Sequence, residues 1–401
     1  MKLQQNSPQD YPLDLSLPWD LPLESWPAEL FVDVARGISR NIVRFTQFRG
    51  RIYAIKEIAE KLARHEFQFL RKMQEMDAPS VRPVALVTQR RDSPNRALLV
   101  TQYLDFSMPY RVIMSESSWE YGYDPLLDAL AQLLVWLHLQ GIYWGDCSLS
   151  NTLFRRDAGR LAAYFVDAET AEQRDKLSDG QRDLDLMIAQ TNLGGELLDL
   201  QAGFGLPEGV DPIGMTEDLL SKYHQLWQEL TQVEYIALDE QYRVDKRIQR
   251  LHDLGYDVEE MEFETTPDGN RLKLLTKVVE PGHHIRILES LIGEKVQANQ
   301  ARRLLTEINR FRAHLNHTRR ERGEPELDEQ AAALEWYQDE YREVLNLIAP
   351  DLRQLMDEAE IYHQLLEHRW YESEKAHRDV GWHDAVSSFV TNILLPRAGM
   401  S

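Results

Sequence analysis

Residues 137–151 read Leu-His-Leu-Gln-Gly-Ile-Tyr-Trp-Gly-Asp-Cys-Ser-Leu-Ser-Asn, and this stretch decides how the chain is interpreted. It places a carboxylate, Asp146, five positions before a carboxamide, Asn151, directly after an apolar segment. This is the spacing of a phosphoryl-transfer catalytic loop, in which the Asp receives the proton of an attacking hydroxyl and the Asn holds a magnesium ion on the nucleotide phosphates. The pair alone is a weak signal, because Asp and Asn also favour turns.

The residues that follow strengthen this interpretation. Residues 151–154 and 161–166 are two short apolar runs on either side of a turn at 157–160, which predicts a β-hairpin that ends at Asp167. Magnesium prefers oxygen ligands and usually takes only one or two carboxylates from the protein, so Asp167 is the expected principal ligand. The alternative is that Asp167 only caps a helix over 168–172. Its convergence with the Asp and Asn of the loop favours the metal site.

A further polar position lies upstream, in a segment that alternates like a strand. Residues 51–58 place Lys56 near the end of this segment, after Tyr-Ala-Ile. A lysine at such a position reaches the α and β phosphates of a nucleotide and needs a carboxylate partner. The candidate partner is Glu66, on a segment of helical period, and Glu57 and Glu60 compete with it. A surface lysine beside acidic neighbours is the alternative interpretation.

With these motifs the chain resembles the protein-kinase-like superfamily, in particular its reduced bacterial branches such as the Rio-type and lipopolysaccharide (Kdo and heptose) kinases. The resemblance covers about residues 28–230. It implies a bilobal α+β fold, with ATP and Mg²⁺ in the cleft between a sheet-rich lobe and a helical lobe. It also implies main-chain contacts to adenine near Gln102 and Leu104, and a glycine-rich phosphate loop near Gly37 and Ser39.

The glycine-rich loop departs from the family pattern. Only Gly37 stands in the segment where several glycines are usual. Ser39 and the backbone amides of a tight turn could bind the phosphates instead, with Arg36 or Arg40 supplying positive charge. This departure favours a nucleotide-binding or scaffold module without catalysis.

Two further motifs also differ. Residues 144–146 read Trp-Gly-Asp in place of His-Arg-Asp, and the missing Arg argues against regulation by activation-loop phosphorylation. Residues 167–169 read Asp-Ala-Glu in place of Asp-Phe-Gly. Glu169 is therefore either a second metal ligand or an exposed acid in the first turn of a helix. The family holds its catalytic loop through an Asp on a later helix, and Asp183 or Asp185 could take this role.

The composition bounds the class of protein. With 401 residues, 43% of them hydrophobic, the chain has room for about two or three domains with buried cores. The net charge of -21 argues against nucleic acid or an anionic membrane surface as the main partner, because both would repel an acidic protein. The single Cys147 excludes internal disulfides and is expected to fill space rather than act as a nucleophile. No apolar stretch approaches about 18 residues and no export signal is visible, so we expect a cytoplasmic protein without a transmembrane segment.

The domain order is predicted from composition and periodicity. The proline-rich residues 1–29 are expected to form an extended N-terminal arm on the folded body, with a disordered tail as the alternative. Residues 30–104 predict a five-stranded N-lobe, and residues 105–232 predict a helical C-lobe with a buried central helix at 125–139. The strands expected in the N-lobe are 30–36, 42–48, 52–58, 81–89 and 97–102, with a helix over 61–76.

Residues 233–401 are expected to form a separate, mostly helical domain that contains a β-hairpin. The hairpin signal is the Pro-Asp-Gly-Asn turn at 267–270, between two alternating segments. Helical patterns span 243–254 and 284–316.

The last part of this domain is rich in aromatic residues. Between residues 334 and 395 they recur at helical spacing, which is typical of a packed core or a domain interface. Residues 359–370 and 378–381 resemble an uncharacterised domain that is attached to such kinase-like domains in bacteria. A metal site on one helix face is possible here, although acids and histidines on a solvated helix are the favoured interpretation. The residues concerned are Glu360, His363, Glu367 and His368.

Two classes of function are consistent with this sequence. In the first, the chain is an ATP- and Mg²⁺-dependent phosphotransferase whose C-terminal domain recognises an unknown acceptor, either a protein Ser or Thr or a sugar or lipid headgroup. In the second, it is an inactive pseudokinase that acts as a nucleotide-binding or regulatory scaffold. The first is favoured, because a scaffold has no need of a base at Asp146.

Overall fold

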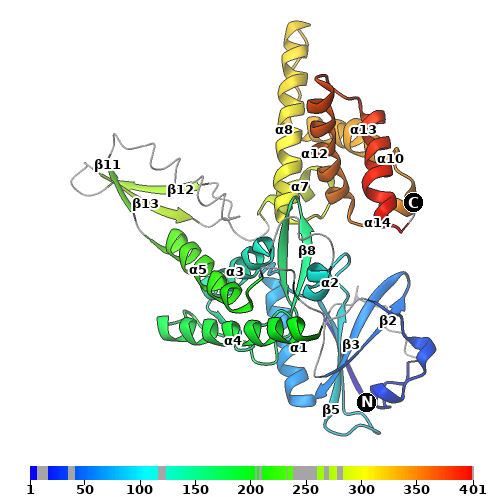
Figure 1. Cartoon of the computed structure of the whole chain (residues 1–401), viewed down its shortest axis with the longest axis vertical. Coiled ribbons are helices and arrows are strands. Elements are labelled where there is room, and N and C mark those ends of the chain that lie inside the picture. The colour runs from blue at the N-terminus through cyan, green and yellow to red at the C-terminus, as the bar shows by residue number, and fades with distance from the viewer. Residues whose placement is uncertain are drawn as a thin grey trace. The chain divides into compact units, whose positions relative to one another are not determined.

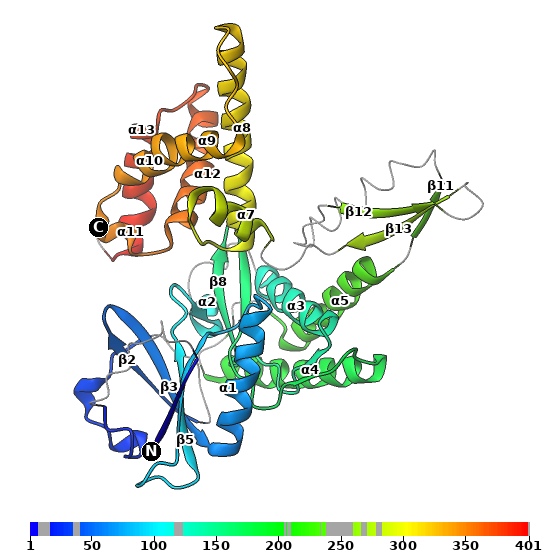
Figure 2. The ribbon, with the colours of Figure 1, turned by 180° about the vertical axis from the view of Figure 1, so that it is seen from behind.

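The protein is described here by a computed structural model (Figures 1 and 2). Two compact units are present, the first comprising Met1–Arg155 and Ala163–Pro281 and the second comprising Arg156–Ala162 and Gly282–Ser401. The finer domain limits expected at 29, 104 and 232 stay predictions. The residues that the structure describes are 1–6, 17–34, 41–115, 123–203, 206, 210–232, 234–237, 260–265, 271–277 and 283–399.

A five-stranded antiparallel sheet begins the first unit, in the order β1-β4-β5-β3-β2. Because side chains alternate along a strand, neighbours on β3 point to opposite faces. Tyr53, Ile55 and Glu57 are buried on one face, and Lys56 therefore points to the other. The strands are β1 (Lys2–Gln5), β2 (Ile42–Phe48), β3 (Arg51–Ala59), β4 (Pro83–Thr88) and β5 (Arg96–Gln102).

The strand expected at 30–36 is wrong over residues 30–34, while 35–36 lie outside the described residues, and β1 takes its place as the fifth strand. Leu30 ends a short 3-10 helix that follows Pro27, and residues 31–34 have no regular structure. Proline favours such a turn, because its ring fixes φ and it has no N–H for a sheet ladder. The amide of Val32 still donates to Phe45 O at 2.9 Å, so this segment touches β2 without joining the sheet.

The N-terminal arm packs on the buried face of this sheet. Trp19, Leu23 and Trp26 are almost completely buried there. Arg90 and Glu57 form a buried ion pair beneath the arm, and Glu57 Oε2 also accepts from the Leu23 amide at 2.9 Å. The tryptophans thus anchor a chain that cannot form a regular helix.

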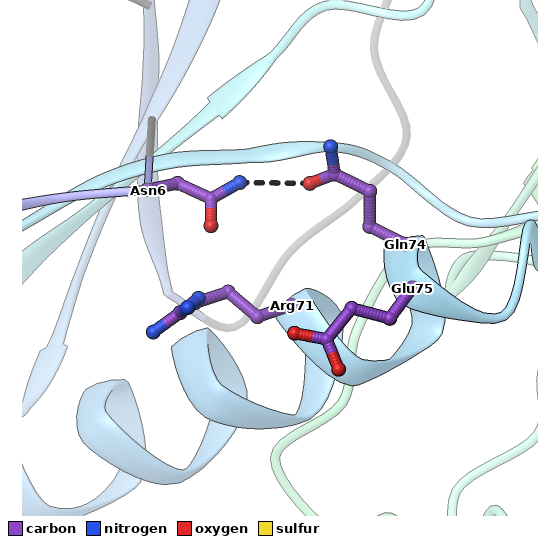
Figure 3. A pocket seen from close by; sticks show the side chains of 4 residues that line it. All are labelled: Asn6, Arg71, Gln74 and Glu75. Atoms are coloured by element: carbon purple, nitrogen blue, oxygen red, sulfur yellow. Dashed lines mark hydrogen bonds between the residues drawn. The ribbon is translucent and has the colours of Figure 1, made fainter. Parts of the chain in front are cut away.

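Helix α1 (Glu60–Glu75) covers the opposite face of the sheet. Its buried residues Ala63, Phe67 and Leu70 recur at the period of a helix and form its core-facing stripe. Near its end, Gln74 accepts a hydrogen bond from Asn6 Nδ2 at 2.7 Å, which ties the residue after β1 to the helix (Figure 3). The bounds of α1 confirm the helix over 61–76 that the sequence predicts.

The rest of the first unit is mainly helical, and the mixed α+β fold is confirmed. The predicted central helix is α3 (Asp124–Leu139), which is buried on nearly every side. The short strands and further helices before and after it in the chain are β6 (Met108–Pro109), α2 (Tyr110–Ser115), β7 (Ile142–Tyr143), β8 (Thr152–Asp157), β9 (Arg160–Phe165), β10 (Glu172–Gln173), α4 (Asp179–Gly203) and α5 (Pro212–Thr231).

The two strands of the expected C-terminal hairpin are present and pair with each other. Strands β12 (Glu260–Thr265) and β13 (Arg271–Lys277) pair antiparallel, and β11 (Glu234–Ala237) pairs with β13. The turn at 267–270 and the helix expected at 243–254 lie outside the described residues. Within the part of the chain that the structure describes, no helix is both long and apolar enough to cross a membrane.

The second unit is a helical bundle, and one of its predicted helices is interrupted. The continuous helix expected at 284–316 is two helices, because Gly293 adopts a φ of +76° after α7. The side chains of Gln297 and Gln300 then cap the start of α8 reciprocally. The helices are α7 (His283–Ile292), α8 (Ala298–Glu321), α9 (Glu329–Trp336), α10 (Glu343–Asn346), α11 (Pro350–Arg353), α12 (Glu358–Ala376), α13 (Trp382–Phe389) and α14 (Leu395–Arg397).

Aromatic rings build the core of this bundle, as the sequence predicts. Trp336, Tyr341 and Tyr362 are buried, and their ring centroids lie 5.0–5.8 Å apart. Offset and edge-to-face pairs at such distances add to the hydrophobic contribution. The aromatic stripe is not entirely core, since Trp370 and Tyr371 on α12 are more than half exposed.

The turn between β8 and β9 belongs to this second unit and is bound by its helices. Asp157 accepts from the amides of Asn299 at 3.1 Å and Gln300 at 2.8 Å, which lie in the first turn of α8. A carboxylate is favoured there, since the first-turn amides of a helix have no backbone carbonyl partner within the helix. Burial raises the pKa of Asp157 to about 6. Glu360 accepts from the Ala158 amide at 2.8 Å on the same turn.

This contact corrects one expectation for α12. Glu360 and His363 are buried and therefore do not lie on a solvated face. The metal alternative gains no support either, because among the described residues the one candidate group of metal-binding acids is Glu66, Asp167 and Glu169, in the first unit.

Candidate active site

Lys56 lies at the centre of a cluster of carboxylates. Its Nζ is 3.1 Å from Glu66 Oε2 and 2.7 Å from Asp167 Oδ2. It is also 2.8 Å from Glu169 Oε1. The strand β3 and the helix α1 supply the lysine and Glu66, and the segment after β9 supplies the other two acids. Residues 111 positions apart in the chain thus meet at one ammonium group.

The two other candidate partners of Lys56 bind elsewhere. Glu57 points to the opposite face of the sheet and pairs with Arg90. Glu60 accepts from Arg64 Nη2 at 2.6 Å on its own helix. The interpretation of Lys56 as a surface lysine is wrong, since only 13% of its side chain is exposed.

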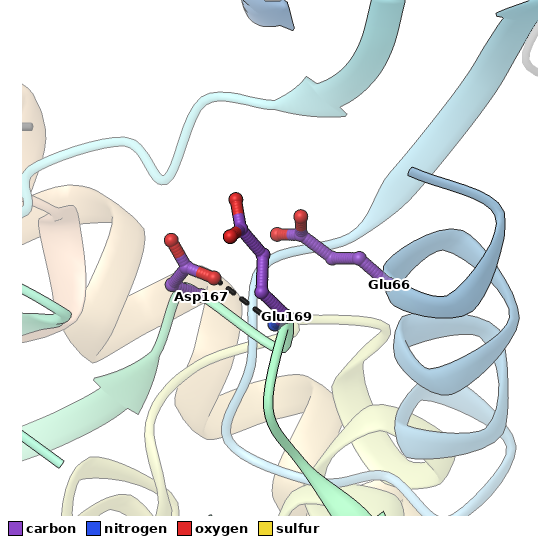
Figure 4. A group of neighbouring side chains, drawn as sticks. All are labelled: Glu66, Asp167 and Glu169. Atoms are coloured by element: carbon purple, nitrogen blue, oxygen red, sulfur yellow. Dashed lines mark hydrogen bonds between the residues drawn. The ribbon is translucent and has the colours of Figure 1, made fainter. Parts of the chain in front are cut away.

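The cluster carries more negative than positive charge. Three carboxylates surround one ammonium, and their oxygens lie within 4.8 Å of one another (Figure 4). Glu66 is the most buried of them, and burial together with the neighbouring acids raises its pKa to about 8. Burial lowers the pKa of Lys56, but attraction to the acids outweighs this effect and the pKa is raised overall. The lysine therefore stays charged at neutral pH, and burial favours the protonated form of Glu66.

This balance predicts a pH dependence of folding. Between pH 4.5 and about 8 the folded chain keeps a proton on Glu66 that the unfolded chain has lost. Folding takes up this proton, so we expect the stability of the first unit to fall as pH rises through this window. The measurement is the urea midpoint at several pH values for the wild type and for Glu66→Gln, which cannot titrate. Exposed Glu75→Gln on the same helix is the matched control, and equal pH slopes for wild type and Glu66→Gln would contradict the prediction.

The segment after β9 forms a turn and no helix. Asp167 Oδ1 accepts from the Glu169 amide at 3.0 Å, and Asn41 Nδ2 donates to Glu169 Oε1 at 2.8 Å. Residues 168–171 are irregular, so the interpretations of Asp167 as a helix cap and of Glu169 as a first-turn acid are both wrong. Both carboxylates point into the cluster instead (Figure 4).

The loop that contains Asp146 and Asn151 is closed by the two residues themselves. Asn151 Nδ2 donates to the backbone oxygen of Asp146 at 2.9 Å and to its Oδ2 at 3.0 Å. The amide of Val166 donates to Asn151 O at 3.2 Å, so this residue lies next to the end of β9, just before Asp167. The sequence pair at spacing five therefore forms one local unit next to the segment of Asp167.

Trp144 stands at the position where the family pattern has a histidine, and it contacts the segment of Asp167. Its ring is completely buried, and its Nε1 donates to the backbone oxygen of Asp167 at 3.2 Å. The next residue, Gly145, has a φ of +76°, and an added Cβ would lie 2.9 Å from the Tyr143 ring. A glycine replaces the family arginine here because the backbone is left-handed and crowded.

Helix α4 holds this loop with more residues than the sequence indicates. Asp185 accepts from the amides of Trp144 at 2.7 Å and Gly145 at 2.8 Å, while Asp183 is exposed. Asn192 and Glu196, which the sequence analysis missed, also contact the loop. The signal that could have found them is their spacing of seven and eleven residues from Asp185, which puts all three on one helix face.

Two buried residues in or next to the loop have structural roles. Cys147 is completely buried, which raises the pKa of its thiol, so it is not a nucleophile. His138 is a core histidine, 2.7 Å from the Tyr223 hydroxyl and 3.1 Å from Asp185 Oδ2.

The nucleotide-binding candidates are only partly within the described chain. Gln102 ends β5, and its amide donates to Arg82 O at 2.8 Å. Leu104 follows in the connection to the helical part. Gly37 and Ser39 lie outside the described residues, as do Arg36 and Arg40.

Comparison with known families agrees with this geometry. Residues 47–197 match the lipopolysaccharide kinase (Kdo/WaaP) family, and residues 225–394 match a domain of unknown function (DUF4032). Comparison with curated proteins gives no match. A solved structure titled "WaaP in complex with acyl carrier protein" is 18% identical, with a TM-score of 0.36, and the alignment covers 63% of this chain and 99% of that chain. The chain thus combines a region that matches the lipopolysaccharide kinase (Kdo/WaaP) family with a region that matches a domain of unknown function, in agreement with the resemblance seen in the sequence.

Proposed function

We propose that this protein is an ATP- and Mg²⁺-dependent phosphotransferase that transfers the γ-phosphoryl group of ATP to a hydroxyl group. The observation that supports this most directly is the convergence of Lys56 with Glu66 and Asp167 in one cluster. The loop of Asp146 and Asn151 is bonded to the same segment through Trp144 and Val166. A positive group for phosphate and oxygen groups for a metal and a proton therefore occupy one unit of the fold.

The residues fit a divalent cation. In the first unit, one ammonium faces three carboxyl groups, which leaves a formal charge of about -1 when Glu66 is protonated and Asp167 and Glu169 are ionised. A hard dication compensates this charge with the oxygen ligands that it prefers. We assign Asp167 and Asn151 as its ligands, with Glu169 as a further acid close by. With Mg²⁺ bound, Asp167 and Asn151 would hold a positive charge beside the phosphates, which would compensate the negative charge that develops there.

Each protein group then has a defined task. Lys56, held by Glu66, binds the α and β phosphates of ATP. Asp146 receives the proton of the acceptor hydroxyl, or orients this hydroxyl for attack. Both tasks depend on positioning, since phosphoryl transfer needs little covalent chemistry from the protein.

The remaining assignments extend this proposal to the nucleotide. Main-chain groups at Gln102 and Leu104 contact adenine, and the segment of Gly37 and Ser39 binds phosphate. The acceptor is a hydroxyl of a protein Ser or Thr, or of a sugar or lipid headgroup. Nucleic acid is a poor acceptor for a chain of net charge -21.

The proposal predicts that ATP stabilises the protein only when Mg²⁺ is present. At ATP concentrations of about 100 Kd, binding contributes about 2.7 kcal/mol, and the melting temperature should rise by roughly 5–10 °C. The measurement is a thermal melt with ATP, with Mg²⁺ and with both, using the wild-type protein. A melting temperature that responds to none of these additions would refute the proposal.

A further inference from the structure

One face of α4 contacts the catalytic loop along most of its length. Asp185 accepts from the amides of Trp144 and Gly145 at the start of the loop. At its other end, Glu196 accepts from the amides of Leu149 at 2.7 Å and Ser150 at 3.0 Å. Positions seven and eleven residues after Asp185 lie on the same side of a helix, so a single rigid element sets the shape of the loop.

Asn192 occupies the middle of this face and reaches the proposed base itself. Its Nδ2 donates to Asp146 Oδ1 at 3.1 Å and to the backbone oxygen of Cys147 at 3.1 Å. Both partners are oxygens that can only accept, so the amide orientation follows from the contacts. Both N–H bonds of the Asn192 amide are used within the loop.

The two oxygens of Asp146 are therefore held by two different amides. Asn151 binds Oδ2 from within the loop, and Asn192 binds Oδ1 from α4. The last torsion of an Asp side chain has a broad, two-fold profile, so one hydrogen bond leaves the carboxylate free to turn. Two bonds on opposite oxygens fix its plane. Each oxygen keeps a lone pair for an incoming hydroxyl.

We propose that Asn192 is a positioning residue, which fixes the Asp146 carboxylate in the orientation that receives the acceptor hydroxyl. This inference rests on the proposed function and adds a residue to it. Asn192 touches neither the cluster around Lys56 nor the metal ligand Asp167 in the contacts described here. Its loss should slow the chemical step and leave nucleotide binding unchanged. A misplacement of about 1 Å at a reacting group costs up to about 100-fold in rate.

The test compares Asn192→Leu, which is close in volume but cannot donate, with Asn192→Ser, which is smaller and polar. The probe is release of inorganic phosphate from ATP with Mg²⁺. We expect kcat to fall about 10- to 100-fold in both variants, with the KM for ATP and the melting shift by ATP and Mg²⁺ unchanged. Thr191→Leu is the matched control, because the neighbouring Thr191 is exposed and donates to the backbone oxygen of Met187 within α4, so this variant should retain full activity.

A second measurement separates positioning from general damage to the fold. If Asn192 acts through Asp146, then Asn192→Leu should have no further effect on the residual rate of Asp146→Asn. A kcat at the wild-type level in either folded variant would overturn the inference. So would an equal fold-loss of kcat when Asn192→Leu is introduced into the wild type and into Asp146→Asn. A wild-type protein that neither binds nor turns over ATP would instead refute the proposed function, so the two failures are distinguishable.

Discussion

Asp146→Asn is expected to lower ATP turnover by about 10²- to 10⁴-fold, because an amide cannot accept the proton of the attacking hydroxyl. The substitution keeps the shape of the side chain and leaves Lys56 and Asp167 in place. ATP with Mg²⁺ should therefore stabilise the variant as much as the wild type. The measurements are phosphate release from ATP and the shift in melting temperature on the same preparation.

The control for this prediction is Asp183→Asn. Asp183 is an exposed acid on α4, two residues before Asp185. Its substitution removes the same charge as Asp146→Asn, but at a position that does not contact the loop. Turnover of the control should equal that of the wild type. Full turnover by Asp146→Asn would show that this residue is not the base. Nucleotide binding without any turnover in the wild type would favour the scaffold alternative.

Asp167→Asn should remove most of the Mg²⁺ dependence of ATP binding, with loss of turnover as the consequence. The change replaces a charged metal ligand by a neutral one, and it also takes one carboxylate from Lys56, which keeps Glu66 and Glu169. Loss of an outer partner of a metal ligand already costs about 10- to 100-fold in affinity, so loss of a charged ligand should cost at least as much. The measurement is a Mg²⁺ titration of the melting temperature at fixed ATP.

Glu169→Gln provides the comparison for this experiment. Glu169 binds the same lysine at 2.8 Å, so this variant loses one carboxylate from the same cluster. Since Asp167 is assigned as the principal ligand, the Mg²⁺ titration should move less in Glu169→Gln than in Asp167→Asn. A normal titration in Asp167→Asn, or a larger shift in Glu169→Gln, would contradict the assignment.

Several features of the site could be predicted because they depend on neighbours in the chain. The Asp146 and Asn151 pair, the hairpin before Asp167 and the helix of Glu66 all follow from spacing and periodicity over short distances. Strand alternation could also have excluded Glu57 as the partner of Lys56, because neighbours on β3 face opposite sides of the sheet. The interrupted helix at Gly293 was missed, since a single glycine is tolerated inside many helical patterns.

Other features depend on contacts between distant segments. The sequence does not indicate that Lys2–Gln5 completes the sheet, because its partner β4 lies about 80 residues later and the pairing depends on how the arm packs. The hydrogen bonds between the loop and the side chains of Asn192 and Glu196 also join segments that are distant in the sequence. Polar residues on a helix are ordinarily solvated, and only packing decides that these two are not.

The sequence by itself determined which residue types are available for phosphoryl transfer and on which local elements they lie. Tertiary structure alone decided that Glu66 and not Glu60 meets Lys56, that Glu169 joins the cluster, and that Asn192 on α4 donates to Asp146. The physical reason is range: local propensities and side-chain periodicity act over a few residues, whereas hydrogen bonds and ion pairs between distant residues exist only after the core has packed.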